Sequence, residues 1–148
     1  MPAAPVNPDV PPIEVDDSQG VLVIVRFRGA ATDAQFAEYL ARYQRHLEGQ
    51  TRVGAVFTTA ETMPLPAPRQ VRLQARFMKD FEPLLRERVI GVAFSLGSPL
   101  MRGVLRGILK MQPMPCPHVV VGTEAEGISW VRAKLWTDNV RRLKSERS

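Results

Sequence analysis

The segment 89–111, VIGVAFSLGSPLMRGVLRGILKM, constrains the fold most because it joins a strand pattern directly to a helix pattern. Its first six residues form a short apolar run of β-branched, aromatic and small side chains, which is typical of a strand buried on both faces. Ser98 then offers a side-chain oxygen at a helix N-cap, and Pro99 occupies the first helical position, where its missing N–H costs nothing. A strand that runs straight into a helix predicts a β-α unit of an α/β sheet.

The helix expected after Ser98 has two unlike faces. Its predicted apolar face consists of Met101, Val104, Leu105, Ile108 and Met111. Arg102, Arg106 and Lys110 line the opposite side, because residues four apart share one face of a helix. Arg76 belongs to a second basic series on the preceding helix. These cations indicate either a solvated surface or a docking surface for an acidic protein or an anionic membrane, whereas nucleic acid is not expected because few aromatic residues accompany them.

The rest of the chain alternates strand and helix patterns around this unit. The expected strands are 13–15, 21–27, 52–58, 89–94 and 118–121, and the expected helices are 33–48, 69–81, 99–111 and 124–140. Thr32 with Gln35, and Thr123 with Glu126, have the spacing of capping boxes at two helix starts. Pro83 is expected to break the second helix, with one further turn before the next strand. The order β-β-α-β-α-β-α-β-α predicts a single α/β domain with a mixed, mostly parallel sheet.

Length and composition indicate that the chain holds one domain and which residues belong to it. The 148 residues, 45% of them hydrophobic, suffice for one core. Residues 1–12 contain five prolines and are expected to form a disordered leader, residues 13–143 the domain, and residues 144–148 a basic tail. The net charge of +5 favours acidic partners. A single cysteine excludes an internal disulfide, and no signal peptide or membrane span is recognisable, so we expect a cytoplasmic protein.

Four pieces of the sequence follow one another in a recognisable order. They are the GVAF strand at Gly91–Phe94, the SPLMRGVL helix start at Ser98–Leu105, the PCPH connector at Pro115–His118, and Trp130 in the final helix. With the order of elements from about Ile13 to Leu135, they resemble the STAS domain of bacterial anti-sigma-factor antagonists. The closer resemblance is to bacterial STAS-like proteins related to the lipid-binding CRAL-TRIO class.

This resemblance implies a non-enzymatic binding module, commonly a partner switch in a bacterial signalling complex. Typical antagonists carry a phosphorylated serine in an Asp-Ser pair after the third strand. The present chain has no Asp-Ser pair there, and Thr58 and Thr59 are the nearest hydroxyl residues that a kinase could modify. The partner implied is another protein, and a homodimer stays open.

No set of residues predicts catalysis, a metal or a cofactor. Cys116 and His118 point the same way on an extended segment, but two prolines stiffen it and no third residue orients the pair. Because His46 is the only other histidine, a histidine-rich metal site cannot be built. The alternative to a protein-binding module is a carrier of a small anion or lipid headgroup, held where the helix N-terminus at Ser98 presents free N–H groups.

Overall fold

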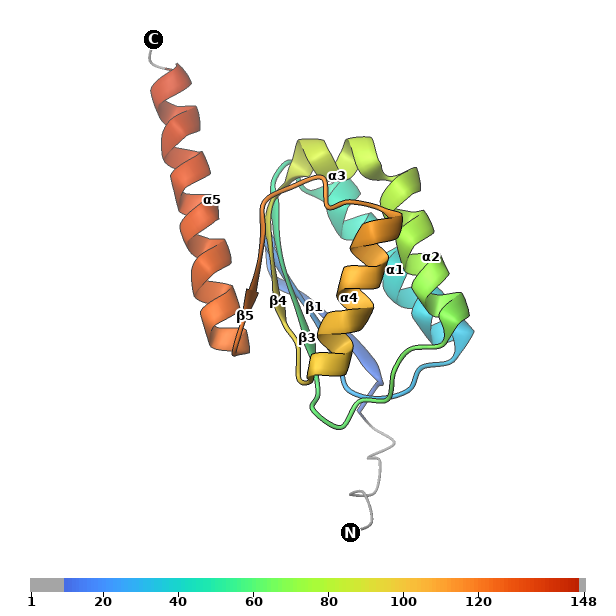
Figure 1. The fold of residues 1–148 in the computed structure, drawn as a ribbon. Helices are drawn as coiled ribbons and strands as arrows, with labels where there is room; N and C mark the ends of the chain where they lie inside the picture. Colours follow the sequence, from blue (N-terminus) through green and yellow to red (C-terminus); the bar gives the residue numbers. More distant parts are fainter. Residues whose placement is uncertain (1–9, 147–148) are drawn as a thin grey trace.

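The computed structural model describes residues 10–146. The first nine residues of the predicted leader and the last two of the predicted tail lie outside the described residues. Figure 1 shows a sheet with helices on both of its faces.

Five strands form one mixed sheet in the order β1-β2-β3-β4-β5. Their bounds are β1 Ile13–Gln19, β2 Leu22–Phe27, β3 Val53–Thr59, β4 Val89–Ser95 and β5 His118–Val121. The first two strands are antiparallel, joined by a turn in which Gly20 has a φ of 68°, and the other neighbours are parallel. Only glycine adopts such a φ at no steric cost. The predicted α/β fold with a mostly parallel sheet is confirmed.

The helices differ from the predicted order by one element. Their bounds are α1 Asp33–Gly49, α2 Pro68–Asp80, α3 Glu82–Arg88, α4 Pro99–Met111 and α5 Glu124–Glu146. Where one further turn is predicted, the separate helix α3 forms, because Pro83 lies in its first turn and needs no N–H partner there. The long helix α5 continues through Glu146, beyond residue 140, where the expected helix ends, and it includes residues 144–146 of the predicted tail.

Local hydrogen bonds explain where two helices begin. Thr32 Oγ1 accepts from the Gln35 N–H (3.1 Å), and Gln35 Oε1 accepts from the Thr32 N–H (2.9 Å), which completes the predicted capping box. At α5, Thr123 Oγ1 accepts from the Glu126 N–H (3.1 Å). Here the reciprocal bond runs from the Thr123 hydroxyl to the Glu126 carboxylate rather than from the backbone.

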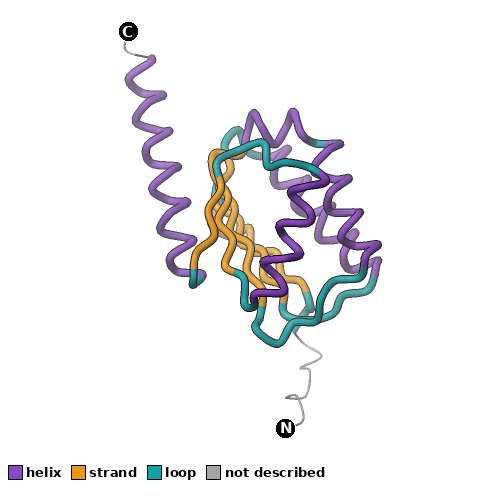
Figure 2. Tube along the Cα trace, viewed as in Figure 1, coloured by secondary structure: helices purple, strands orange, loops and turns teal. Residues whose placement is uncertain are grey.

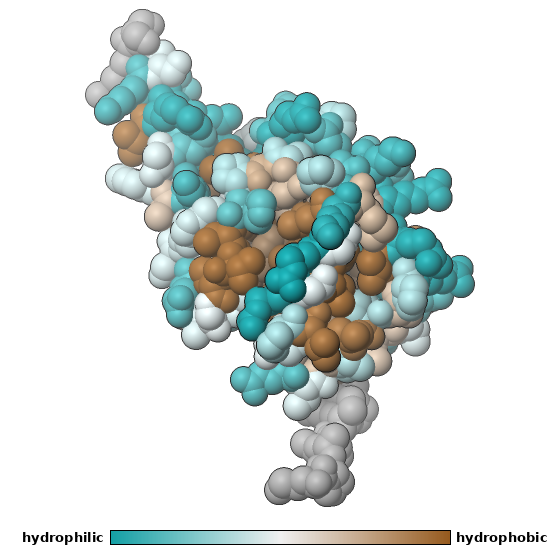
Figure 3. All heavy atoms as spheres, viewed as in Figure 1, coloured by the Kyte–Doolittle hydropathy of each residue, from teal (hydrophilic) through white to brown (hydrophobic). Residues whose placement is uncertain are grey.

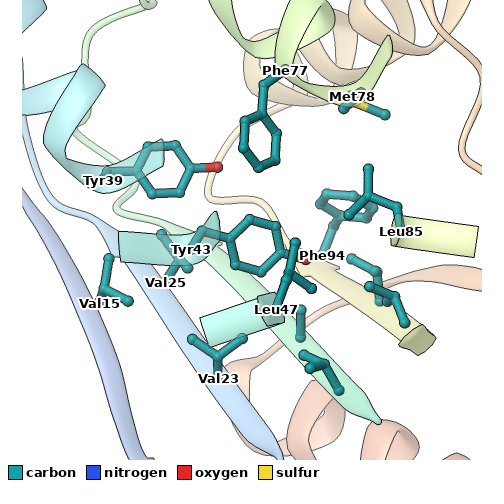
Figure 4. Close-up of a cluster of buried hydrophobic side chains, with 14 of the residues drawn as sticks. Val15, Val23, Val25, Tyr39, Tyr43, Leu47, Phe77, Met78, Leu85 and Phe94 are labelled. Atoms are coloured by element: carbon teal, nitrogen blue, oxygen red, sulfur yellow. The ribbon is translucent and has the colours of Figure 1, made fainter. Parts of the chain in front are cut away.

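The chirality of the connections assigns each helix to a face of the sheet. Right-handed crossovers between successive parallel strands place α1, α2 and α4 on one face, and α5, which follows the last strand, covers the other (Figures 1 and 2). The larger buried cluster lies on the face of α1, α2 and α3, where Tyr43 and Leu47 pack over the strands and the ring of Tyr43 also contacts that of Phe77 (Figure 4). The smaller cluster packs Val131 and Leu135 of α5 against the opposite face.

Candidate functional site

Helix α4 does not pack closely against the sheet. It contacts α2 more than any strand, and Met101 is its only buried residue. Val104, Leu105 and Ile108, which the sequence places on the apolar face, are only half-buried. Met111, predicted to point inward, is 52% exposed, because α4 ends there and no further turn covers the side chain. The apolar face of α4 therefore lies over a space rather than over a packed core.

That space is a cavity of about 350 Å³ between the sheet, α1, α2 and α4. Its volume lies within the range of roughly 300–1,000 Å³ that is common for small-molecule sites. Phe57 and Phe94, paired in register on β3 and β4, stack at 5.7 Å between ring centroids and contribute to its wall. Residues 63–67, in the loop between β3 and α2, and residues 114–116, before β5, also belong to the lining.

The lining carries no formal charge. Among the described residues, none of the side chains that line the cavity belongs to Asp, Glu, Lys, Arg or His. Burial raises the pKa of the Cys116 thiol to about 12, and burial likewise raises the pKa of Tyr39 and Tyr43 above the ordinary tyrosine value. These three groups are therefore protonated and neutral near pH 7. A protonated thiol is a poor nucleophile, so burial disfavours nucleophilic chemistry at Cys116.

Four polar side chains of the lining, those of Tyr39, Thr59, Gln70 and Gln74, already have protein partners. The Tyr39 hydroxyl donates to Gln74 Oε1 (2.9 Å), and Gln70 Nε2 donates to the Ala31 carbonyl (2.9 Å). Thr59 Oγ1 accepts a hydrogen bond from the Gly97 N–H (2.8 Å). With these groups partly occupied, most of the surface offered to a ligand is aromatic and aliphatic.

The predicted binding residues Ser98, Arg102, Arg106 and Lys110 all lie on α4. Ser98 Oγ accepts from the Met101 N–H (3.2 Å), so its oxygen caps the helix as predicted. The three cations are exposed, and no carboxylate of residues 10–146 forms an ion pair with them. Arg76 is not part of this group, since it lies on α2 and pairs with Asp80 at 3.7 Å.

Of the other residues singled out in the sequence, Thr59 and Cys116 line the cavity, whereas Thr58 and His118 are outside its lining. Thr58 and Thr59 end β3 and are half-buried. The oxygen of Thr59 that a kinase would modify is the one that accepts the hydrogen bond from the Gly97 N–H. Cys116 lines the cavity, whereas His118 is exposed on β5, with its ring 6.4 Å from that of Phe94.

The cavity and several of the residues that line it are not predicted by the sequence patterns. Tyr39, Gln70 and Phe77 are buried and line the cavity. One signal was present, because the proline-dense loop 59–68 is longer than most α/β connections, and long ordered loops are often functional. In the structure, residues 63–67 of this loop border the cavity.

The described residues contain no group of three or more His, Cys, Asp or Glu side chains placed to hold a metal ion. None of the helices in residues 10–146 is both long and apolar enough to cross a membrane. No protein-family model, curated protein or solved structure shows significant similarity to this chain. The resemblance to STAS-like proteins therefore stays a prediction.

Proposed function

We propose that this domain is a non-enzymatic binding protein for a small molecule with an apolar chain, held in the cavity beneath α4. The observation that supports this function is an uncharged cavity of about 350 Å³ whose roof is a helix with a half-buried apolar face. Removing apolar surface from water is favourable by about 25 cal/mol per Å². A ligand that fills the cavity would therefore complete the burial of α4.

The proposed ligand is amphipathic or wholly apolar. A charged group inside an uncharged cavity would lose its hydration without gaining a partner, so any headgroup has to stay at the opening. The sequence predicts that a lipid headgroup binds at Ser98, and the present proposal adds that the apolar chain of the same lipid occupies the cavity. The headgroup itself would lie outside, on the surface of the domain.

A titration with saturated fatty acids of increasing chain length tests the proposal. A ligand that binds only the folded state raises the melting temperature, by an amount equivalent to about 2.7 kcal/mol at a hundred times its Kd. We expect the melting temperature to rise most at one chain length. The bound ligand should also slow alkylation of Cys116, the only cysteine in the chain. No rise with any chain length would contradict the proposal.

Two matched substitutions on α4 locate the bound chain. Leu105→Trp places an indole in the cavity and should abolish the ligand-induced rise, whereas Leu100→Trp adds the same group to a position that is 68% exposed and outside the lining. Circular dichroism of both variants shows whether the fold is kept. Equal loss of binding in both variants would show that the ligand does not occupy the cavity.

A second candidate function is the protein-interaction module that the STAS-like resemblance implies. It is favoured by the C-terminal half of α5, where Trp136 is 69% and Leu143 is 50% exposed. Together with the half-buried Val140, these side chains form a stripe at helical spacing. If the partner is a second copy of the chain, sedimentation velocity should show concentration-dependent dimers that the double variant Trp136→Ser, Leu143→Ser does not form.

A further inference from the structure

The outer face of α4 combines cations with exposed apolar side chains. Arg102, Arg106 and Lys110 follow its length at four-residue spacing. Figure 3 shows a hydrophilic band that crosses this side of the molecule between two apolar areas. Leu100 at the start of the helix is 68% exposed, and Met111 at its end is 52% exposed.

The positive charge of this face is not neutralised locally. The sequence contains no acidic residue between Glu87 and Glu124, a stretch that includes β4, α4 and β5. Ten arginines elsewhere in the described chain form ion pairs with carboxylates, namely Arg26, Arg28, Arg42, Arg45, Arg52, Arg69, Arg76, Arg86, Arg141 and Arg142. The cations of α4 are therefore available to an external anion.

The loop before α2 adds a further apolar side chain to this side of the molecule. Leu65 is 52% exposed, and it lines the same cavity as the inner residues Met101 and Leu105 of α4. Leu65 therefore lies where the cavity opens to the surface. Exposed leucine and methionine side chains beside a row of cations are typical of surfaces that lie in a membrane interface.

The distribution of these side chains favours a bilayer over an acidic protein. A protein interface usually has apolar anchors at its centre and charges at its rim. On α4 the cations occupy the middle, and the apolar side chains lie at the two ends and on a separate loop. On an anionic bilayer, the cations can contact several lipid headgroups while the peripheral apolar side chains enter the interface.

We propose that α4 and Leu65 form a docking surface for a membrane rich in anionic lipid. Docking in this orientation turns the opening of the cavity toward the bilayer. If the proposed ligand binding is correct, an apolar chain then passes between bilayer and cavity with little exposure to water. The membrane contact itself does not depend on that ligand, because it is made by the exposed residues.

Co-sedimentation with vesicles tests the docking surface. The protein is mixed with vesicles of phosphatidylcholine alone, or of equal parts phosphatidylcholine and phosphatidylglycerol, over a series of salt concentrations. We expect binding to the anionic vesicles only. It should weaken with salt, because exposed charges are screened over about 10 Å at 0.1 M ionic strength.

Charge reversals on the two faces of the sheet provide matched variants. Each basic residue near an anionic bilayer strengthens partitioning roughly fivefold, so Arg102→Glu with Arg106→Glu should weaken binding by at least about 25-fold. The control, Arg132→Glu with Lys134→Glu, makes the same change in net charge on exposed positions of α5 and should keep most of the binding. Leu100→Ser should weaken binding without changing its salt dependence.

Several outcomes would overturn the docking proposal. The protein could bind neutral and anionic vesicles equally, or it could bind neither. The α4 variant and its α5 control could also lose vesicle binding to the same extent. Saturable binding of an acidic protein by the α4 face, without vesicle binding, would also overturn it. The fatty-acid titration of the Arg102→Glu, Arg106→Glu variant is measured in parallel, so loss of docking and loss of the cavity function are distinguished.

Discussion

The two faces of the sheet are packed in opposite ways. On the face of α5, a Cβ added at Gly54 would overlap Val131 Cγ1 and lie 3.0 Å from Leu135 Cδ1, and one at Gly127 would lie 3.2 Å from Val56 Cγ1. Glycine on both the strand and the helix thus permits a close approach. On the face of α4, a cavity separates the helix from large aromatic side chains of the strands. The α5 face is packed closely, whereas the opposite face combines the larger core beneath α1, α2 and α3 with a cavity beneath α4.

Glycine-to-alanine substitutions should give the largest difference between the two faces in the free energy of unfolding. Gly54→Ala forces a methyl into the contact with Val131 and should lower the free energy of unfolding by about 3 kcal/mol. Gly107→Ala on α4 meets nothing within 4 Å and should raise it by about 0.5–1 kcal/mol, because alanine restricts the unfolded chain. Urea denaturation measures both values. Equal destabilisation by the two variants would contradict the comparison.

Replacing a leucine by alanine should also lower the free energy of unfolding more on the α5 face than on the α4 face, but by a smaller margin. Leu135 of α5 is 8% exposed, so Leu135→Ala should cost about 2–3 kcal/mol. Leu105 of α4 borders space that is already present, so Leu105→Ala should cost about 1 kcal/mol. The measurement is again urea denaturation, without added ligand. A cost at Leu105 that matches the cost at Leu135 would mean that α4 packs as tightly as α5.

Acid should affect the α5 face through Asp138. Burial by itself raises the pKa of this carboxyl, but hydrogen bonds and charges from Arg141 and Arg52 outweigh it and leave the pKa below its ordinary value. Since the unfolded pKa is about 3.9, the stabilisation is fully present above that pH and is lost as the pH falls through the lower folded value. Asp138→Asn should therefore flatten the fall in stability below about pH 4.

The α4 face provides the control for this acid effect. The cavity lining has no carboxylate among the described residues, so Leu105→Ala should lower stability equally at every pH and leave the acid slope unchanged. Melting temperatures over a pH series compare the two variants. An unchanged slope in Asp138→Asn would show that Asp138 and its arginine partners do not contribute to acid unfolding.

The smallest effect on stability is expected for the docking surface itself. Arg102 and Arg106 are exposed and form no ion pair within residues 10–146, so their reversal to Glu should change the free energy of unfolding by no more than about 0.5 kcal/mol per site. Thermal and urea unfolding of the double variant measure this directly. A loss of several kcal/mol would mean that these side chains are part of the packed structure.

The sequence predicts those features that depend on residues close together in the chain. The bond from the Gln35 N–H to Thr32 and the bond from the Met101 N–H to Ser98 each span three residues, so the residue types alone indicate where α1 and α4 begin. The exposed positions of Arg102, Arg106 and Lys110 also follow from helical spacing and the absence of acidic neighbours.

Only the tertiary structure decided where these elements meet and how closely they pack. Periodicity shows that α4 has an apolar face, but its distance from the sheet depends on side chains of several other elements, such as Phe57 on β3 and Phe94 on β4. The burial of Gln70 likewise depends on the Ala31 carbonyl, 39 positions away in the chain. A cavity is the volume left between many such long-range contacts, and no local pattern of residues encodes it.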